Sequence, residues 1–286
     1  MAILLALASA VLYGAADFLG GFASKRASTL SVLVLSQLVS VATVLAALCV
    51  FPRATVHEID LVWGAGAGLI GGAGLVLFYR GLATGTMSVF APITGVAAIA
   101  VPVLVGLFDG ERPRPTPLLG IVLAAVSVVC VSVAVVPRGA DGRRSIRAAI
   151  SGRELATALA AGVAFGCFYV AIKHASPTAG LWPLFAARGM SVVAYAIVAA
   201  ATGRTLRASR AVLPIIAWTG VVDMLANICF LLALDRGMLS LVGTLASLYP
   251  AATVVLARIV LRERLGAVQG VGLGMAMVAV GLMSVG

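Results

Sequence analysis

Charged residues are scarce in this sequence. Only 10% of its 286 residues are Asp, Glu, Lys or Arg, whereas 62% are hydrophobic and the mean hydropathy is +1.15. A water-soluble domain of this length needs far more polar surface than this composition supplies. The composition therefore excludes an ordinary soluble protein and predicts a protein embedded in a lipid bilayer.

The side chains that carry most metal and acid–base chemistry are scarce as well. The sequence has two histidines, His57 and His174, and four cysteines that stand singly in apolar segments. It shows no CxxC spacing, no paired carboxylates and no phosphate loop followed by Lys-Ser/Thr. We therefore expect no metal, no cofactor, no catalytic residue and no enzyme activity. A polytopic membrane enzyme and a channel remain less favoured alternatives.

The net charge of +10 raises the question of nucleic acid as a partner. The basic residues lie in short gaps between apolar runs, without interleaved aromatic residues or a basic face. This distribution is typical of membrane loops, so we expect a lipid bilayer and no nucleic acid.

Ten apolar runs are long enough to cross a membrane, which takes about 20 residues in a helix. The longest gap between runs, 138–154, is basic and predicts a linker between a first half at 1–137 and a second half at 155–286. We therefore expect an all-α membrane protein of ten transmembrane helices. The runs are 2–22, 30–50, 61–82, 86–107, 116–136, 155–173, 180–201, 211–234, 239–261 and 266–285.

The two halves match without a gap when the chain is shifted by 152 residues. Glu111-Arg112 then falls on Glu263-Arg264, and Gly14 falls on Gly166. Five helices in each half insert the second half upside down, and inverted repeats are typical of transporters with a site near the midplane. We expect two inverted five-helix repeats around a central cavity, with the Glu-Arg pairs as structural anchors of loops.

Several segments resemble the drug/metabolite transporter (DMT) superfamily, in particular its ten-helix EamA type. They are Tyr13 to Phe18 in the first run, Gly81 to Pro113, and the counterpart Ala233 to Leu265. The resemblance implies a secondary transporter whose fourth and ninth helices line a central cavity. Members of this group export amino acids, other metabolites or drugs. The sequence itself adds that no nucleotide-binding motif is present.

Polar residues of the first and sixth runs are the first candidates for a binding site. Tyr13 and Asp17 lie one turn apart on one helical face, and Tyr169 and Lys173 occupy the corresponding face of the sixth run. A pseudo-symmetric bundle would point Asp17 and Lys173 toward one central space. The alternative is that Asp17 is an interfacial cap or salt-bridge residue.

The eighth run contains a better-placed acid, Asp223, near its centre. Asn227 follows one turn later on the same face, and Arg188 in the seventh run is a candidate cation for an ionised Asp223. A charged group inside a membrane needs such a partner and points to a functional site. A neutral Asp223 would instead suit proton coupling, and a purely structural hydrogen bond between helices is the third reading.

Prolines divide two of the runs. Pro92 and Pro102 are predicted to interrupt the fourth run, and Pro250, beside Tyr249, the ninth. A proline removes one hydrogen bond of the helix, and broken helices at matching positions indicate a transport site or gate. Tyr249 could offer a hydrogen bond to a substrate.

We therefore expect a small-molecule substrate, such as an amino acid, exported across the cell membrane by alternating access. Efflux of cationic drugs in exchange for protons is the alternative, because the same residues could bind a cation. A monomer suffices for such a site, and a dimer is an alternative. The basic residues favour a cytoplasmic linker and external termini, whereas the resemblance implies cytoplasmic termini.

Overall fold

The computed structural model describes residues 1–50, 54–84, 87–132, 152–203, 206–261 and 267–284, and there it is entirely helical. Helices suit a chain in lipid, because they satisfy every backbone polar group within the segment. The first five are α1 (Ala2–Ser24), α2 (Thr29–Val50), α3 (Glu58–Thr84), α4 (Met87–Phe108) and α5 (Pro115–Ser132). The others are α6 (Gly152–His174), the 3-10 helix η1 (Pro177–Ala179), α7 (Trp182–Ala201), α8 (Leu213–Leu234), α9 (Leu239–Ala246), α10 (Tyr249–Leu261) and α11 (Ala267–Ser284).

Six of these helices are long and apolar enough to cross a membrane: α1, α2, α3, α6, α7 and α8. The remaining apolar helices are shorter within the described residues and correspond to the fourth, fifth, ninth and tenth predicted runs. Within the described residues, each predicted run therefore contains helix. Helix α6 already begins at Gly152, so the last three residues of the predicted linker 138–154 belong to it, and 138–151 lie outside the described residues.

The proline predictions have opposite outcomes. The ninth run is broken: α9 ends at Ala246, α10 begins at Tyr249, and Pro250 occupies the first turn of α10, where a missing N–H costs little. The predicted interruption of the fourth run at Pro92 and Pro102 is wrong, because α4 is continuous across both residues. Pro102 is buried against Gly243 of α9, and membrane helices tolerate proline where neighbouring helices support them.

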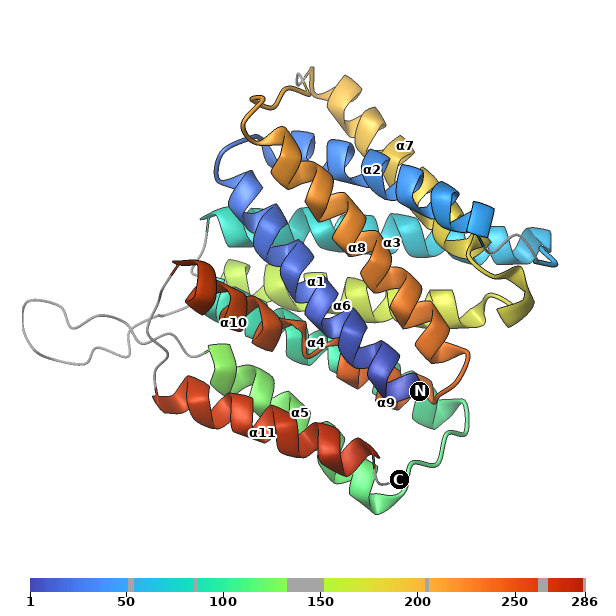
Figure 1. Ribbon diagram of the computed structural model, residues 1–286, viewed down its shortest axis with the longest axis vertical. Coiled ribbons are helices and arrows are strands. Elements are labelled where there is room, and N and C mark those ends of the chain that lie inside the picture. The colour runs from blue at the N-terminus through green and yellow to red at the C-terminus, as the bar shows by residue number, and fades with distance from the viewer. Residues whose placement is uncertain (51–53, 85–86, 133–151, 204–205, 262–266, 285–286) are drawn as a thin grey trace, which may run out of the picture.

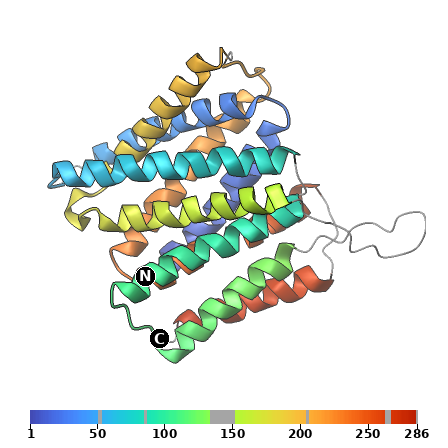
Figure 2. The same cartoon turned by 180° about the vertical axis from the view of Figure 1, so that it is seen from behind.

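Helices of the first half pack mainly on helices of the second half. Helix α1 lies against α8, α3 against α6 and α7, α4 against α6, and α2 against α7 and α8 (Figure 1). Helices α5 and α11 pair at one edge of the bundle, and the start of α1 lies at the same end of the molecule as the end of α11 (Figures 1 and 2). The core of the bundle is therefore an interface between the two halves.

Glycines let the backbones of the two halves touch at several of these crossings. A Cβ added to Gly68 of α3 would collide with the carbonyl oxygen of Ala187 on α7, and one added to Gly220 of α8 with that of Ser36 on α2. Small residues at crossings of membrane helices allow such close approach. These contacts fix the relative positions of the helices that carry the polar residues described next.

Candidate functional site

A cavity lies between the two halves and is lined by residues of both. The described residues of its wall come from α1, α3, α6, α7, α8 and α10. The polar part of the wall contains Tyr13, Asp17, Arg188, Asp223, Asn227 and Tyr249, and the rest contains Gly71, Leu75, Phe165, Phe168 and Tyr169. The structure therefore gathers most of the predicted site residues around one space.

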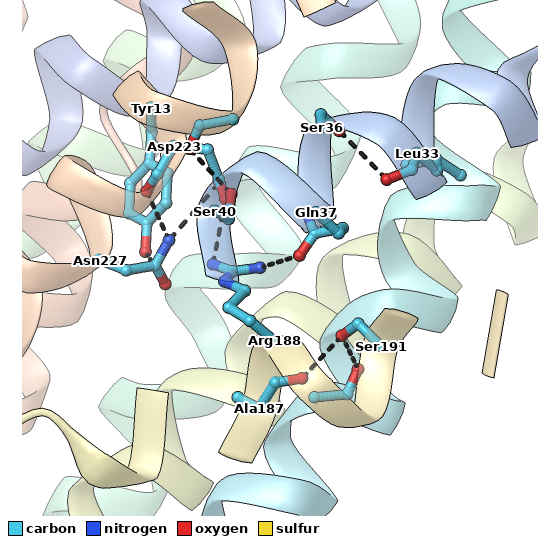
Figure 3. A network of polar contacts seen from close by, with 12 residues as sticks. Tyr13, Leu33, Ser36, Gln37, Ser40, Ala187, Arg188, Ser191, Asp223 and Asn227 are labelled. Atoms are coloured by element: carbon cyan, nitrogen blue, oxygen red, sulfur yellow. Dashed lines mark hydrogen bonds and ion pairs between the residues drawn. The ribbon is translucent and has the colours of Figure 1, made fainter. Parts of the chain in front are cut away.

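Arg188 and Asp223 form a buried ion pair in the wall of this cavity. Arg188 Nη2 lies 3.1 Å from Asp223 Oδ2, and the two side chains are only 6% and 14% exposed. The other terminal nitrogen, Nη1, donates a hydrogen bond of 3.1 Å to Gln37 Oε1 on α2 (Figure 3). The cation that the sequence predicted for Asp223 is thus present. Gln37 binds its second terminal nitrogen, whereas the buried Arg188 Nε has no hydrogen-bond partner among the described residues.

A chain of hydrogen bonds continues from Asp223 to α1. Asn227 Nδ2 donates to the backbone oxygen of Asp223 at 2.7 Å and lies 3.5 Å from Asp223 Oδ1. Tyr13 Oη donates to Asn227 Oδ1 at 2.8 Å (Figure 3). Residues of α1, α2, α7 and α8 therefore share one polar network whose members hold one another in position.

Asp17 lines the same cavity outside this network. It lies one helical turn beyond Tyr13 on α1, as the sequence spacing predicted. In the described part of the chain its carboxylate has no hydrogen-bond or ion-pair partner. An interfacial cap or salt bridge, the alternative reading of Asp17, is therefore not formed among the described residues.

Aromatic rings cover much of the remaining wall. Tyr169 packs against Tyr13 at 6.3 Å and against Phe230 at 4.4 Å between ring centroids. The Arg188 guanidinium lies 5.9 Å from the centroid of Phe168, which is within reach of a cation–π interaction. Tyr249 is buried and its hydroxyl has no hydrogen-bond partner in the described residues. The cavity thus offers aromatic faces and one free hydroxyl.

Lys173 is not part of this site. Its side chain is exposed at the C-terminal end of α6, where Nζ donates a 3.3 Å hydrogen bond to the backbone oxygen of Leu234. The prediction that Lys173 and Asp17 point toward one central space is therefore not met. A lysine at a helix end can extend toward the membrane surface more cheaply than into the core.

Gln37 and several apolar lining residues, among them Phe168, were not predicted from the sequence. Gln37 is neutral and stands among apolar residues of α2, although a buried amide in a membrane helix is itself a signal of an interhelical contact. Phe168 could not be distinguished from the other apolar residues of α6 because its position in the wall depends on the crossing of α6 with α3 and α7.

The cavity residues also follow the 152-residue shift. Tyr13 corresponds to Phe165, Asp17 to Tyr169, Gly71 to Asp223 and Leu75 to Asn227, and all eight residues line the cavity. In all four pairs a residue from the polar part of the wall stands opposite an apolar or aromatic one from the other half. The two halves contribute equivalent positions to the wall but different chemistry.

Glu111 connects the halves outside the cavity. Its carboxylate accepts hydrogen bonds from the backbone nitrogens of Leu239 (2.5 Å) and Ser240 (2.9 Å) at the N-terminus of α9. This arrangement satisfies two otherwise unpaired N–H groups of α9 and places a negative charge at the positive end of the helix. The expected anchoring role fits this contact for Glu111, whereas Glu263 lies outside the described residues.

A comparison with models of known protein families identifies the family of this chain. The model of the EamA-like transporter family matches residues 1–133 and again residues 153–285. The chain belongs to the EamA-like transporter family, and hence to the DMT superfamily. This membership supports a multi-pass membrane protein and a role in transport.

A solved structure has a fold similar to that of this EamA-like chain. A solved crystal structure superposes with a TM-score of 0.78 over 99% of this chain and 96% of the other, at 15% sequence identity. An identity this low supports the fold alone. No curated protein matches the sequence significantly.

Proposed function

We propose that this EamA-like protein is a secondary transporter that moves a small organic molecule across the cell membrane through the cavity between its two halves. The observation that carries the proposal is the buried polar network of Arg188, Asp223, Asn227 and Tyr13 inside a cavity walled by both halves. Charged groups are expensive inside a membrane, and those that face a cavity there mark substrate or ion pathways.

We further propose that the halves are inverted repeats that work by alternating access. The double match of the family model and the four pairs of cavity residues related by 152 positions support a repeat. The packing supports it as well, because α1 on α8 corresponds to α6 on α3, and α3 on α7 corresponds to α8 on α2. In such proteins one half rocks against the other around a site at their interface.

The direction and the substrate remain part of the proposal. Export of a small metabolite such as an amino acid is the first candidate, because the wall combines charged, polar and aromatic groups. Export of cationic compounds in exchange for protons is the second candidate, and the unpaired carboxylate of Asp17 favours it.

Counterflow in proteoliposomes tests the transport function directly. Vesicles preloaded with an unlabelled candidate should accumulate the same labelled compound faster than empty vesicles, and the rate should saturate. Asp223→Asn should reduce this flux strongly, whereas Asp235→Asn, exposed at the end of α8 and outside the cavity, should not. Ohmic conductance without saturable exchange would instead identify a channel and overturn the proposal.

A further inference from the structure

Hydrogen bonds join the two halves at the terminal face, the end of the molecule that carries the start of α1 and the end of α11 (Figure 1). Asp60, in the first turn of α3, is only 1% exposed, and its Oδ1 accepts a 2.7 Å hydrogen bond from the backbone N–H of Ser176, between α6 and α7. Beside it, the backbone N–H of Thr55 donates to the backbone oxygen of Thr178 at 2.8 Å, and Thr178 Oγ1 donates to the backbone oxygen of Thr55 at 3.3 Å. The start of α3 and the residues before it are therefore tied to the second half.

The carboxylate of Asp60 strengthens this connection. Its Oδ2 accepts a second hydrogen bond, of 2.9 Å, from the backbone N–H of His57 and so caps the start of α3. Hydrogen bonds to a charged acceptor are roughly twice as strong as those between neutral groups. A buried carboxylate that loses such a bond also loses its compensation for lost hydration, so parting Asp60 from Ser176 is costly.

Opening the cavity toward the terminal face would break the hydrogen bond between Asp60 and Ser176. The backbones of the two halves touch where Gly68 of α3 meets Ala187 of α7. Asp60 precedes Gly68 by eight residues in the sequence, which is about 12 Å along the helix. A tilt of α3 by about 10° at this contact would move Asp60 by about 2 Å, which is enough to break a hydrogen bond of normal length.

The equivalent positions at the opposite face, which carries the end of α1 and the start of α8, have different chemistry (Figure 1). Under the 152-residue shift Asp60 corresponds to Val212, which is buried in one apolar cluster with Ala23. Ser176 corresponds to Ser24, whose buried hydroxyl has no hydrogen-bond partner among the described residues. At this position the opposite face therefore offers an apolar side chain instead of a charged acceptor.

The threonine pair also has a different counterpart at the opposite face. Thr55 and Thr178 correspond to Arg207 and Arg26, and both arginines are exposed. Like charges repel each other, so two cations oppose a close approach of these positions. The terminal face thus has groups that hold the halves together where the opposite face has groups that do not.

We infer that Asp60 is a one-sided latch, which holds the terminal face closed and leaves the cavity to open first toward the opposite face. The inference rests on the proposed function, because it concerns access to the same cavity. Breaking the latch shifts the protein without ligand toward a state that is open at the terminal face.

Spin labels at Val50 and Asp235, near the ends of α2 and α8 at the terminal face, test the latch in nanodiscs without ligand. The amide of Asp60→Asn cannot accept both backbone hydrogen bonds as the carboxylate does. The ratio of the longer-distance to the shorter-distance population should therefore rise about tenfold or more. Glu58→Gln alters an exposed acid of the same helical turn and should leave the distribution unchanged. An unchanged distribution in Asp60→Asn would overturn the inference.

A second pair of variants separates the latch from the cap of α3. Ser176 has a φ of −63°, which proline adopts, so Ser176→Pro removes the N–H donor while Asp60 still caps α3. This variant should shift the distances as Asp60→Asn does. Ser176→Ala keeps the donor and should not shift them. A shift in Asp60→Asn without one in Ser176→Pro would show that Asp60 acts on α3 alone, and would overturn the latch.

Counterflow of labelled phenylalanine and of labelled tetraphenylphosphonium in proteoliposomes separates this inference from the transport proposal. Saturable counterflow of either probe, with unchanged distances in both latch variants, would keep the transporter and remove the latch. Shifted distances in both variants, with saturable counterflow of neither probe, would keep the latch and count against the transporter.

Discussion

At the scale of single residues, the ion pair of Arg188 and Asp223 has two effects that should be distinguished. Because the two side chains bind each other, neither charge is free to bind a ligand. The ion pair also joins α7 to α8 inside the bundle. Buried pairs gain little over apolar side chains of similar size, but a buried charge left alone is costly. We therefore expect the pair to matter for specificity more than for stability.

Replacing one member of the pair should expose this difference. Arg188→Met should lower the free energy of unfolding by about 3–5 kcal/mol, because Asp223 then remains buried without a cation. The double variant Arg188→Met with Asp223→Leu should recover most of this loss, since neither charge remains. Unfolding in mixed detergent, followed by circular dichroism, measures both values.

The double variant should therefore stay folded under conditions in which the single variant Arg188→Met unfolds. Equal stability losses in the single and double variants would contradict this account and make the pair a net stabiliser of the fold.

Some residues of the candidate site could be predicted from the sequence, and others could not. An acid in the middle of an apolar run requires a partner, and this requirement correctly pointed from Asp223 to Arg188. The same reasoning did not place Lys173, because a residue at a helix end can satisfy its charge near the membrane surface. Gln37 carries no charge, so only the three-dimensional packing revealed its role.

At the scale of elements, the loop after α4 contacts the start of α9, the first part of the broken ninth run. The second part of that run, α10, contributes to the cavity wall. Glu111 caps the start of α9, and the chain resumes as α10 with Tyr249, which lines the cavity. Helix α9 has only eight residues, so its position depends strongly on contacts at its ends. Glu111 is thus a positioning residue for the helix that precedes Tyr249.

Removing this cap should loosen α9. In Glu111→Ala, amide hydrogen exchange at the start of α9 should become about tenfold faster, because a lost cap costs about 0.5–2 kcal/mol. Glu111→Gln should lie between this variant and the wild type, since the amide oxygen still accepts one hydrogen bond. Asp109→Ala, an exposed acid in the same loop, provides the control.

Exchange that stays at the wild-type rate in Glu111→Ala would contradict the capping role. Faster exchange in Asp109→Ala as well would indicate a general effect of charge in the loop and not of the two hydrogen bonds to Leu239 and Ser240.

The helices themselves were largely predictable, whereas the effect of each proline was not. Apolar length alone located all ten runs, because a membrane helix must cover the same thickness whatever its neighbours are. The break before Pro250 and the continuity of α4 across Pro102 depend on what faces each proline. Pro102 faces Gly243 of another helix, a contact between distant residues that no local pattern contains.

At the scale of the whole molecule, the two halves are held together at equivalent backbone contacts. Gly68 corresponds to Gly220 under the 152-residue shift, and their neighbours Ala187 and Ser36 come from the opposite half in each case. The sequence suggested the duplication through Glu111 and Gly14, but it could not show that the glycines meet backbone across the interface. That contact depends on the way the halves cross.

If the halves rock as proposed, these two glycine contacts are the points about which α7 and α8 would tilt. Beyond them, 14 residues remain from Ala187 to the end of α7 at Ala201, and 14 from Gly220 to the end of α8 at Leu234. At 1.5 Å per residue each arm is about 21 Å long, so a tilt of about 10° would move its tip by about 4 Å while the contact itself stays closed.

Spin labels can measure such lever motion. A pair at Val50 and Asp235, near the tips of α2 and α8, should change its distance distribution when substrate is added to the protein in nanodiscs. A pair at Leu38 and Trp218, which are exposed beside the contact of Gly220 with Ser36, should keep its distribution. Equal changes in both pairs would indicate sliding without a fixed pivot. In that case the two halves would slide past each other along the glycine contacts instead of rocking about them.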